Sequence, residues 1–292
     1  MMKTKERIIE AGLKFSSLIT VLTTLGILWV LLSQSLVFFG EVSIIEFLTS
    51  REWTPLFENK HYGILPLLAG TALTTFVAIA VALPLGITIA IYLSEYASAP
   101  IRNTFKPLLE ILAAVPTVVY GFFALTVVTP FLKGILPELA TFNALSAGLV
   151  MGVMIIPMVS SLSEDALRAV PNSLREAAYG MGSTRLQTAF RVLVPAASSG
   201  IVVSVLLAIS RAIGETMIVT IAAGQQPNLT FNPMETVETI TAYIVQVSLG
   251  DVPHGSIEYR TIFAAGLMLF VLTFILNNIS YFVKKRYQQQ YE

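Results

Sequence analysis

Arg211 and Glu215 are two opposite charges in the middle of an apolar stretch that runs from residue 192 to residue 223. Charges deep in a hydrophobic segment are costly, and they typically face a cavity or a partner. A guanidinium presents planar, bidentate donors that suit phosphate or carboxylate groups. Since residues four apart share a helix face, the pair has two interpretations. It is either a structural ion pair that locks the helix to a neighbour, or an anion site on a pathway through a membrane.

The anion interpretation gives each residue a role. Arg211 would meet the oxyanion, while Glu215 would hold the guanidinium when no anion is present and would prevent tight trapping. Gly214 between them would let another helix approach closely. Thr216 and Thr220 on the same predicted helix could donate to the anion, although threonine hydroxyls more often bond back to their own helix.

A second constellation lies in the polar segment PNSLREAAYGMGSTRLQTAFRVLVPA, residues 171–196. The stretches 173–176 and 184–187 both match a capping box. Gly180 and Gly182 between them can take the left-handed conformation that ends a helix. These signals predict two short helices with a glycine break, followed by a long apolar helix.

The first of these short helices would present small side chains at Ala177 and Ala178, where the backbone of another protein could approach closely. This helix would lie outside the membrane and would dock another protein. Pro195 would begin the next membrane helix. The simpler interpretation is that Glu176 caps its helix and that the glycines only turn the chain.

Both constellations need helices to position them, and the composition indicates helices in a membrane. The chain of 292 residues is 55% hydrophobic and 12% charged, whereas soluble proteins carry about 25% charged residues. Stretches of about 20 apolar residues can span a bilayer, whereas a transmembrane barrel would show alternating segments of about 10 residues. The fold class is therefore expected to be an all-α membrane protein with six transmembrane helices. They are predicted at residues 18–39, 64–93, 108–131, 144–162, 196–223 and 261–283.

Proline and a shorter apolar segment refine this prediction. Pro84, Pro116 and Pro157 fall inside predicted spans. They predict kinks rather than helix ends, because neighbouring helices can satisfy the freed carbonyls. The apolar segment 239–250 is too short to span the membrane, and it is expected to form an external or re-entrant helix.

The distribution of Lys and Arg predicts the orientation. With six spans both termini share one side; of the 18 Lys and Arg residues, thirteen lie on that side, four on the other, and Arg211 within a span. Cytoplasmic loops carry such an excess, so both termini are expected in the cytoplasm. The predicted organisation is an N-terminus at 1–17, a first helix and external segment at 18–63, a helical core at 64–283 with a cytoplasmic loop at 164–195, and a tail at 284–292.

The same sequence disfavours other classes of function. Cysteine is absent, and His61 and His254 form no cluster, so no metal site is expected. A net charge of zero gives no electrostatic case for nucleic acid. No predicted span carries the Ser–His or paired-Asp arrangement of an intramembrane enzyme. The inverted repeats of a gradient-driven secondary transporter are not apparent, and neither is a G-x-x-x-x-G-K-[ST] phosphate loop for ATP hydrolysis.

The polar segment resembles the EAA signature of ABC-importer permeases, which is EAA, three residues, Gly, nine residues and Ile-x-Leu-Pro. The matching residues here are Glu176, Ala177, Ala178, Gly182, Val192, Val194 and Pro195. Val replaces the family's Ile and Leu, which is a mild departure. The resemblance implies a type I ABC importer permease fold, with one N-terminal helix plus a five-helix core. It also implies that this loop is a coupling helix that inserts into a groove on a separate ATPase subunit.

Three further segments, residues 47–55, 211–228 and 249–277, resemble the PstC-type permease of the phosphate-specific ABC importer. RAIGET is shared with the sister PstA type, whereas the first segment and the stretch after RAIGET point to the PstC type. In that family the Arg and Glu of the motif are associated with phosphate transport, and they correspond to Arg211 and Glu215. The resemblance therefore implies an anion gate in a pore between two chains.

The resemblance also implies an assembly in the bacterial inner membrane. A second, PstA-type permease would complete the pore, and a phosphate-binding protein would dock outside. Two ATPase subunits would bind ATP and Mg²⁺, so this chain would hold no cofactor of its own. A permease for another oxyanion, such as molybdate or sulfate, shares the EAA loop and is the alternative within this class. A homodimeric pore is a further alternative.

Overall fold

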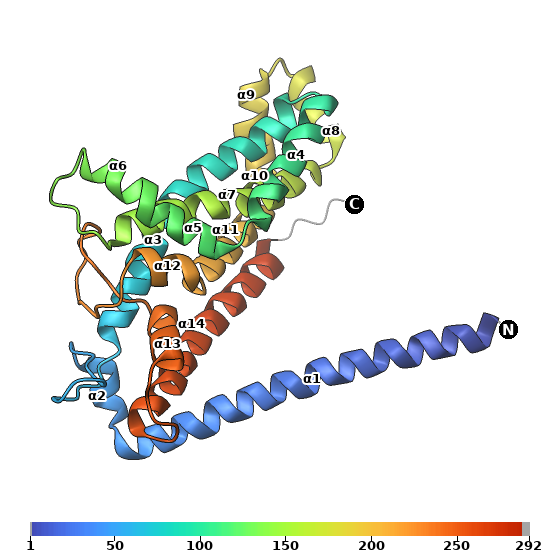
Figure 1. Ribbon diagram of the computed structural model, residues 1–292. Coiled ribbons are helices and arrows are strands. Elements are labelled where there is room, and N and C mark those ends of the chain that lie inside the picture. Colours follow the sequence, from blue (N-terminus) through green and yellow to red (C-terminus); the bar gives the residue numbers. More distant parts are fainter. Residues whose placement is uncertain (1, 288–292) are drawn as a thin grey trace.

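The computed structural model describes residues 2–287 and shows an all-helical chain (Figure 1). Over these residues the only β pairing is an isolated bridge between Trp53 and Tyr62. Four helices are long and apolar enough to cross a membrane, and the number rises to six when each of two bent helix pairs is counted as one span. The predicted all-α membrane fold is therefore confirmed. Of the predicted tail, residues 288–292 lie outside the described part of the chain.

The four continuous spans are α1 (Met2–Glu41), α3 (Leu65–Ile91), α7 (Ala144–Arg168) and α14 (Ile257–Tyr287). Pro84 and Pro157 lie inside α3 and α7, which continue through them. The short helix predicted at 239–250 is α13. The remaining elements, in which η marks a π-helical turn, are α2 (Ile44–Thr49), η1 (Tyr92–Tyr96), α4 (Ala99–Ala114), α5 (Thr117–Phe123), η2 (Ala124–Val128), α6 (Thr129–Lys133), α8 (Asn172–Gly180), α9 (Arg185–Thr188), η3 (Ala189–Leu193), α10 (Val194–Ala196), α11 (Ser198–Ile213), α12 (Met217–Ala222) and α13 (Ile240–Leu249).

Helices α3 and α7 form the centre of the bundle, because glycines let their backbones meet. A Cβ atom added at Gly148 would lie 2.6 Å from the Cβ of Val77, and one at Gly152 would lie 2.8 Å from the carbonyl oxygen of Ala78. Small residues at such contacts are typical of membrane helix pairs. Larger side chains at these positions would force the two helices apart.

The third predicted span, residues 108–131, is not one straight helix. Helix α4 and the helical run that begins at Thr117 meet at an angle of 84°. The bend lies at Val115, which is extended because a residue before proline avoids the helical region. Across the bend the hydroxyl of Tyr120 donates to the carbonyl oxygen of Leu112 at 2.8 Å. The kink predicted at Pro116 is therefore a full break in the span.

The fifth predicted span, residues 196–223, is broken twice. The helical run Arg185–Ala196 meets α11 at 74°, with the bend at Ala197. Pro195 therefore lies before the bend, and the prediction that it opens the membrane helix is wrong. Helix α11 then ends at Ile213, and α12 begins at Met217. Arg211 consequently lies on α11, whereas Glu215 lies within the break.

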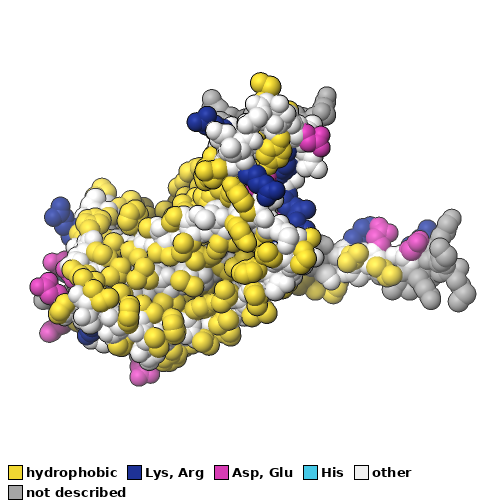
Figure 2. All heavy atoms as spheres, turned by 90° about the horizontal axis from the view of Figure 1, so that it is seen from above, with side chains coloured by type: hydrophobic (Ala, Val, Ile, Leu, Met, Phe, Trp, Pro, Cys, Tyr) yellow, Lys and Arg dark blue, Asp and Glu magenta, His cyan; other side chains and the backbone are white. Residues whose placement is uncertain are grey.

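Helix α1 is peripheral to the rest of the bundle. It contacts α14 and projects away from the other helices towards its N-terminus (Figure 1). Phe38 near its C-terminal end is buried, whereas Trp29 is 74% exposed. Figure 2 shows hydrophobic side chains over most of the visible face of the molecule. Exposed apolar surface of this extent marks contact with lipid or with other proteins.

Several of the shorter helices mark two opposite ends of the bundle (Figure 1). Helices α4, α8 and α9 lie at one end, called the α8 end below. Helices α2 and α13 lie at the other, called the α13 end. At the α13 end the rings of Trp53 and Tyr243 pack edge to face with centroids 5.0 Å apart, and the Tyr243 hydroxyl shares a 2.6 Å hydrogen bond with Thr261. This aromatic packing ties the α13 end to α14.

Candidate functional site

The break between α11 and α12 separates Arg211, which lies on α11, from Glu215, which lies within the break. Gly214 follows α11 as its C-cap, and Thr216 is the N-cap of α12. Glu215 lies between them and is only 6% exposed. The prediction that the two charges share the face of one helix is therefore wrong.

The freed backbone groups at this break have partners, as a break at membrane depth requires. The Glu215 carboxylate accepts a hydrogen bond from the backbone N–H of Ile218 at 3.3 Å, which caps the start of α12. The Glu215 carbonyl accepts one from the Thr241 hydroxyl of α13 at 2.6 Å. The Thr216 hydroxyl donates to the Gly214 carbonyl at 3.3 Å. Glu215 is therefore engaged in holding the break together.

Arg211 is exposed, and its Nη2 lies 3.8 Å from the sulfur of Met154 on α7. A thioether is a weak acceptor. In the described part of the chain no carboxylate lies within ion-pair distance of Arg211. The prediction that Glu215 holds the guanidinium is therefore wrong for this structure, because Glu215 bonds to Ile218 instead. Among the described residues, Arg211 is thus an arginine near the end of α11 without a charged partner, and its side-chain hydrogen bond is to a thioether.

The predicted threonine donors bond within their own segment. Thr220 donates to the carbonyl of Thr216 at 2.6 Å, and Thr216 donates to Gly214. Each hydroxyl proton is thus already used, as the local interpretation expected. A role for Thr216 in substrate contact stays a prediction that would require its hydroxyl to rotate.

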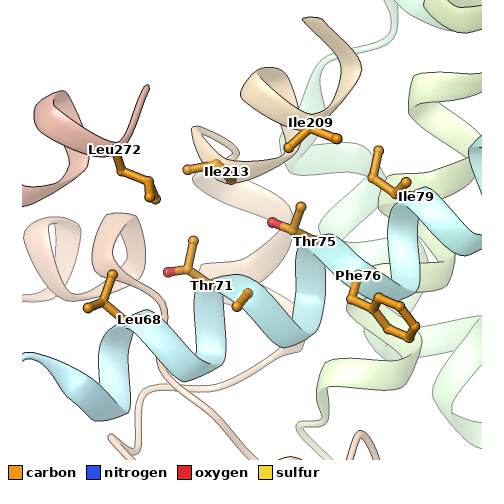
Figure 3. Close-up of a pocket in the computed structure, with 9 residues that line it drawn as sticks. Leu68, Thr71, Thr75, Phe76, Ile79, Ile209, Ile213 and Leu272 are labelled. Carbon is orange, nitrogen blue, oxygen red and sulfur yellow. The ribbon is translucent and has the colours of Figure 1, made fainter. Parts of the chain in front are cut away.

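An apolar cavity of about 410 Å³ lies beside the end of α11 (Figure 3). Its lining comes from α3, α11 and α14 and consists of Leu68, Thr71, Ala72, Thr75, Phe76, Ile79, Ile209, Ile213 and Leu272. The Thr71 hydroxyl already donates to the Leu67 carbonyl and accepts from the Ile240 N–H. A dianion would lose its hydration there without gaining charged donors. This cavity is therefore unsuited to an oxyanion.

A polar pocket of about 400 Å³ lies at the other end of α12. It is lined by Phe142, Thr220, Gly224, Gln225, Gln226, Thr236 and Gln246. The Thr236 hydroxyl donates to the Phe142 carbonyl at 2.7 Å. The carbonyl of Ala222, the last residue of α12, accepts from the Asn143 N–H at 2.9 Å. No acidic side chain lines this pocket, so it offers amide groups without repelling an anion.

Glu238, between α12 and α13, is a buried carboxyl that sequence reasoning did not single out. It is 1% exposed, and its Oε1 has no hydrogen-bond partner in the described part of the chain. Burial raises the pKa of the Glu238 carboxyl to about 8. Because its pKa in the folded protein is raised, folding favours the protonated form. The resulting loss of stability is absent below the unfolded pKa of 4.5, grows as the pH rises, and is complete above about pH 8.

Replacing Glu238 by glutamine is therefore expected to raise the thermal unfolding midpoint at pH 8.5, because the free energy of burying the ionised carboxylate, on the order of a few kcal/mol, is removed. The gain should shrink as the pH falls towards 5. Thermal unfolding of the purified complex at both pH values measures this. Glu235→Gln is the matched control: hydrogen bonds from Thr230 and Asn232 lower the pKa of Glu235. An equal gain at both pH values for Glu238→Gln would contradict the prediction.

Helix α8 holds the residues predicted to contact an ATPase. It begins at Asn172 after Pro171, without a side-chain cap, so the capping box predicted at 173–176 is wrong. The second capping box is confirmed, since Thr184 and Gln187 bond each other's backbone N–H groups. Pro171 takes the N-cap position instead, with φ of −55° and ψ of 140°.

Gly182 ends α8 in the left-handed conformation, with φ of +80°. The Gly182 N–H bonds to the Tyr179 carbonyl at 2.9 Å and the Ser183 N–H to the Ala178 carbonyl at 3.1 Å, which is the Schellman arrangement. The predicted glycine break is therefore at Gly182, while Gly180 is the last residue of the helix.

The predicted coupling residues lie on an accessible surface at the α8 end. Glu176, Ala177, Gly182 and Pro195 are exposed, and Ala178 is half-buried. Sequence reasoning missed the apolar side chains beside them. These are Tyr179, Met181, Leu186 and Phe190, with Met181 88% exposed. A cluster of exposed apolar side chains next to small residues suits a protein–protein contact.

Glu164, near the end of α7, is an internal residue. It is 1% exposed and forms an ion pair with Lys106 of α4 at 2.8 Å. It forms a second ion pair with Arg168 at 3.5 Å. Asp165 pairs with the same lysine at 3.0 Å. The two pairs made by Lys106 fasten α4 to the C-terminal end of α7.

The class of the protein follows from its similarity to known families. Residues 82–289 match the family described as "Binding-protein-dependent transport system inner membrane component". The match covers more than half of the chain and includes α8, Arg211 and Glu215, so the chain belongs to this family of ABC importer permeases.

Individual relatives and solved structures agree with this assignment. The chain is 38% identical over 234 residues to the "Probable ABC transporter permease protein YqgH" of Bacillus subtilis, covering 80% of this chain and 75% of the relative. It is 34% identical over 272 residues to the phosphate transport system permease protein PstC of Mesorhizobium japonicum, covering 87% and 81%. A bacterial alginate ABC transporter has a similar fold, with a TM-score of 0.59 and 17% identity over 89% of this chain and 94% of that one. The methionine transporter MetNI gives a TM-score of 0.57 and 18% identity over 78% and 95%.

Proposed function

We propose that this chain is the permease subunit that carries inorganic phosphate through an ABC importer, with Arg211 as its anion contact. The observation that carries the proposal is the exposed guanidinium, which has no ion-pair partner among the described residues and bonds to a thioether. A charge at membrane depth needs a counter-charge or a water-filled path, and a guanidinium can hold a phosphate through two parallel hydrogen bonds. The relatives named as phosphate transport permeases support phosphate as the anion.

The proposal includes an orientation and an assembly. The α8 end and both termini face the cytoplasm of a bacterial cell, and the α13 end faces outward. A PstA-type permease completes the pore, two ATPase subunits receive α8, and an external phosphate-binding protein delivers the anion. ATP and Mg²⁺ are bound by the ATPase subunits, and this chain contributes no cofactor. The exposed helix α8 with its apolar rim supports the docking role.

Uptake of radiolabelled phosphate tests the substrate. Cells that lack other phosphate importers would express this chain with its partner subunits, and a large excess of unlabelled phosphate, sulfate or molybdate would be added as competitor. We expect labelled uptake that unlabelled phosphate abolishes and the other two anions leave intact. An assembled complex that takes up sulfate or molybdate instead would replace phosphate by that oxyanion while keeping the family assignment.

A further inference from the structure

An ion pair at the α8 end joins two residues that lie 80 positions apart in the chain. Nη2 of Arg175 on α8 is 3.2 Å from Oε1 of Glu95 in η1, and Nε donates to the same oxygen at 3.4 Å. The two side chains are only 15% and 5% exposed. The pair is therefore largely shielded from water, although α8 itself lies at the surface.

The same guanidinium also closes the end of α7. Nη2 donates to the Leu167 carbonyl at 2.8 Å, and Nη1 donates to the Val170 carbonyl at 2.6 Å. The last carbonyls of a helix lack partners within it, and a cation is favourable at this end. We call Arg175, Glu95 and these two carbonyls the Arg175 junction. One side chain thus ties α8 to the ends of both α3 and α7.

The junction depends on the shape of the guanidinium as well as on its charge. Its donors point in fixed directions in one plane, so it can serve a carboxylate and two carbonyls at once. A lysine ammonium carries the same charge at a single point and reaches fewer of these acceptors. The pair of variants Arg175→Lys and Glu95→Gln therefore separates the loss of geometry from the loss of charge.

The helices that the junction holds lead towards Arg211. Helices α3 and α7 are in close contact, since a Cβ at Gly86 would lie 2.7 Å from a methyl carbon of Val159. Helix α7 is joined to α11 by a buried hydrogen bond of 2.8 Å between the hydroxyls of Ser163 and Ser204. Further along, Met154 of α7 contacts Arg211 of α11. The contacts are continuous from α8 to the anion contact.

We infer that Arg175 is a positioning residue that transmits movement of α8 to the α3–α7 pair and, through α7, to α11. The inference rests on the proposed role of α8 as the helix that docks the ATPase. When ATP binding displaces α8, the junction makes α3 and α7 follow. Without the junction, α8 would move while α11 and Arg211 stay behind, and ATP would be hydrolysed without transport.

The first test measures ATP hydrolysis and phosphate movement together in proteoliposomes that contain the complete complex. We expect Arg175→Lys and Glu95→Gln to raise the ATP consumed per phosphate by between roughly twofold and thirtyfold, the usual range for residues on a coupling path. The KM for phosphate should stay unchanged. Because the ratio is taken per turnover, a smaller amount of folded complex does not alter it. Arg102→Lys on α4, an arginine with no described side-chain partner, should leave the ratio unchanged.

A second test does not depend on the substrate. Spin labels at the exposed positions Val202 on α11 and Ile279 on α14 report the distance between these helices with and without ATP. We expect an ATP-driven change in the otherwise native chain and in Arg102→Lys, and a smaller change in Arg175→Lys. Normal coupling and a normal distance change in both junction variants would overturn the inference. The complex with native Arg175 and Glu95 could show the ATP-driven distance change and yet transport no phosphate. In that case the substrate proposal fails, and the distance change alone decides the role of the junction.

Discussion

Replacing Arg211 by glutamine is expected to lower phosphate uptake by about 100-fold or more, the typical effect of deleting one preorganised donor from a charged, desolvated contact. Glutamine retains hydrogen-bonding groups but carries no charge. The fold should persist, because in the described part of the chain the hydrogen bond of the Arg211 side chain is the weak one to the sulfur of Met154. The measurement is initial uptake of labelled phosphate at low concentration, with the amount of complex in the membrane equalised by immunoblot.

Two companion variants sharpen this result. Arg211→Lys keeps the charge but loses the planar fork, so its uptake should fall between that of the native chain and that of Arg211→Gln. Arg7→Gln removes an exposed charge from α1, remote from the break, and should leave uptake unchanged. Uptake close to normal in Arg211→Gln would mean that the arginine is a structural residue.

Glu176→Lys and Gly182→Asp are expected to uncouple the ATPase while leaving the break between α11 and α12 undisturbed. Both positions are exposed on the docking surface, and a poor contact at the centre of an interface typically costs about 2 kcal/mol or more, roughly 30-fold in affinity. A Cβ atom at Gly182 would meet no atom within 4 Å, although the left-handed backbone there strains any side chain. Aspartate and asparagine adopt this conformation more readily than other residues with a side chain. The helix should therefore keep its end, and the added carboxylate should act on the partner. Co-purification of the ATPase and transport-linked ATP hydrolysis measure the effect.

Controls separate docking from folding in these variants. Gly182→Asn has nearly the same shape as Gly182→Asp without the charge, and it should bind the ATPase better. Arg211→Gln serves as the reciprocal case, because it should lose transport while retaining the ATPase. Full association and coupling in both Glu176→Lys and Gly182→Asp would remove the docking role of α8.

Local patterns predicted the parts of the structure that depend on local physics. Apolar length identified the continuous spans α3 and α7, and the short apolar segment at 239–250 is α13. The cap at Thr184 and the left-handed glycine at position 182 follow from hydrogen bonds within a few residues. Such features are encoded within one or two helical turns, so they can be read from the chain.

The breaks and the junction could not be predicted, because they depend on partners far away in the chain. Hydropathy indicates that residues 196–223 prefer an apolar environment, but it does not indicate where the helix axis changes direction. The break between α11 and α12 is stabilised by a hydrogen bond from Thr241, which lies 26 residues after Glu215. Glu95 bonds to Arg175 across 80 residues. In each case the deciding hydrogen bond exists only once the helices have packed.

The break between α11 and α12 makes the distance between two opposite charges adjustable. On a continuous helix the separation of residues 211 and 215 would be set by the helical repeat. Here Arg211 belongs to α11, which is anchored to α7, while Glu215 is anchored to α12 and α13. With Arg211 as the proposed anion contact, a tilt of α11 against α12 would change how strongly the Glu215 carboxylate repels the bound anion. A difference in affinity between two conformations is what a ligand needs in order to shift their balance, and we expect the break to supply that difference.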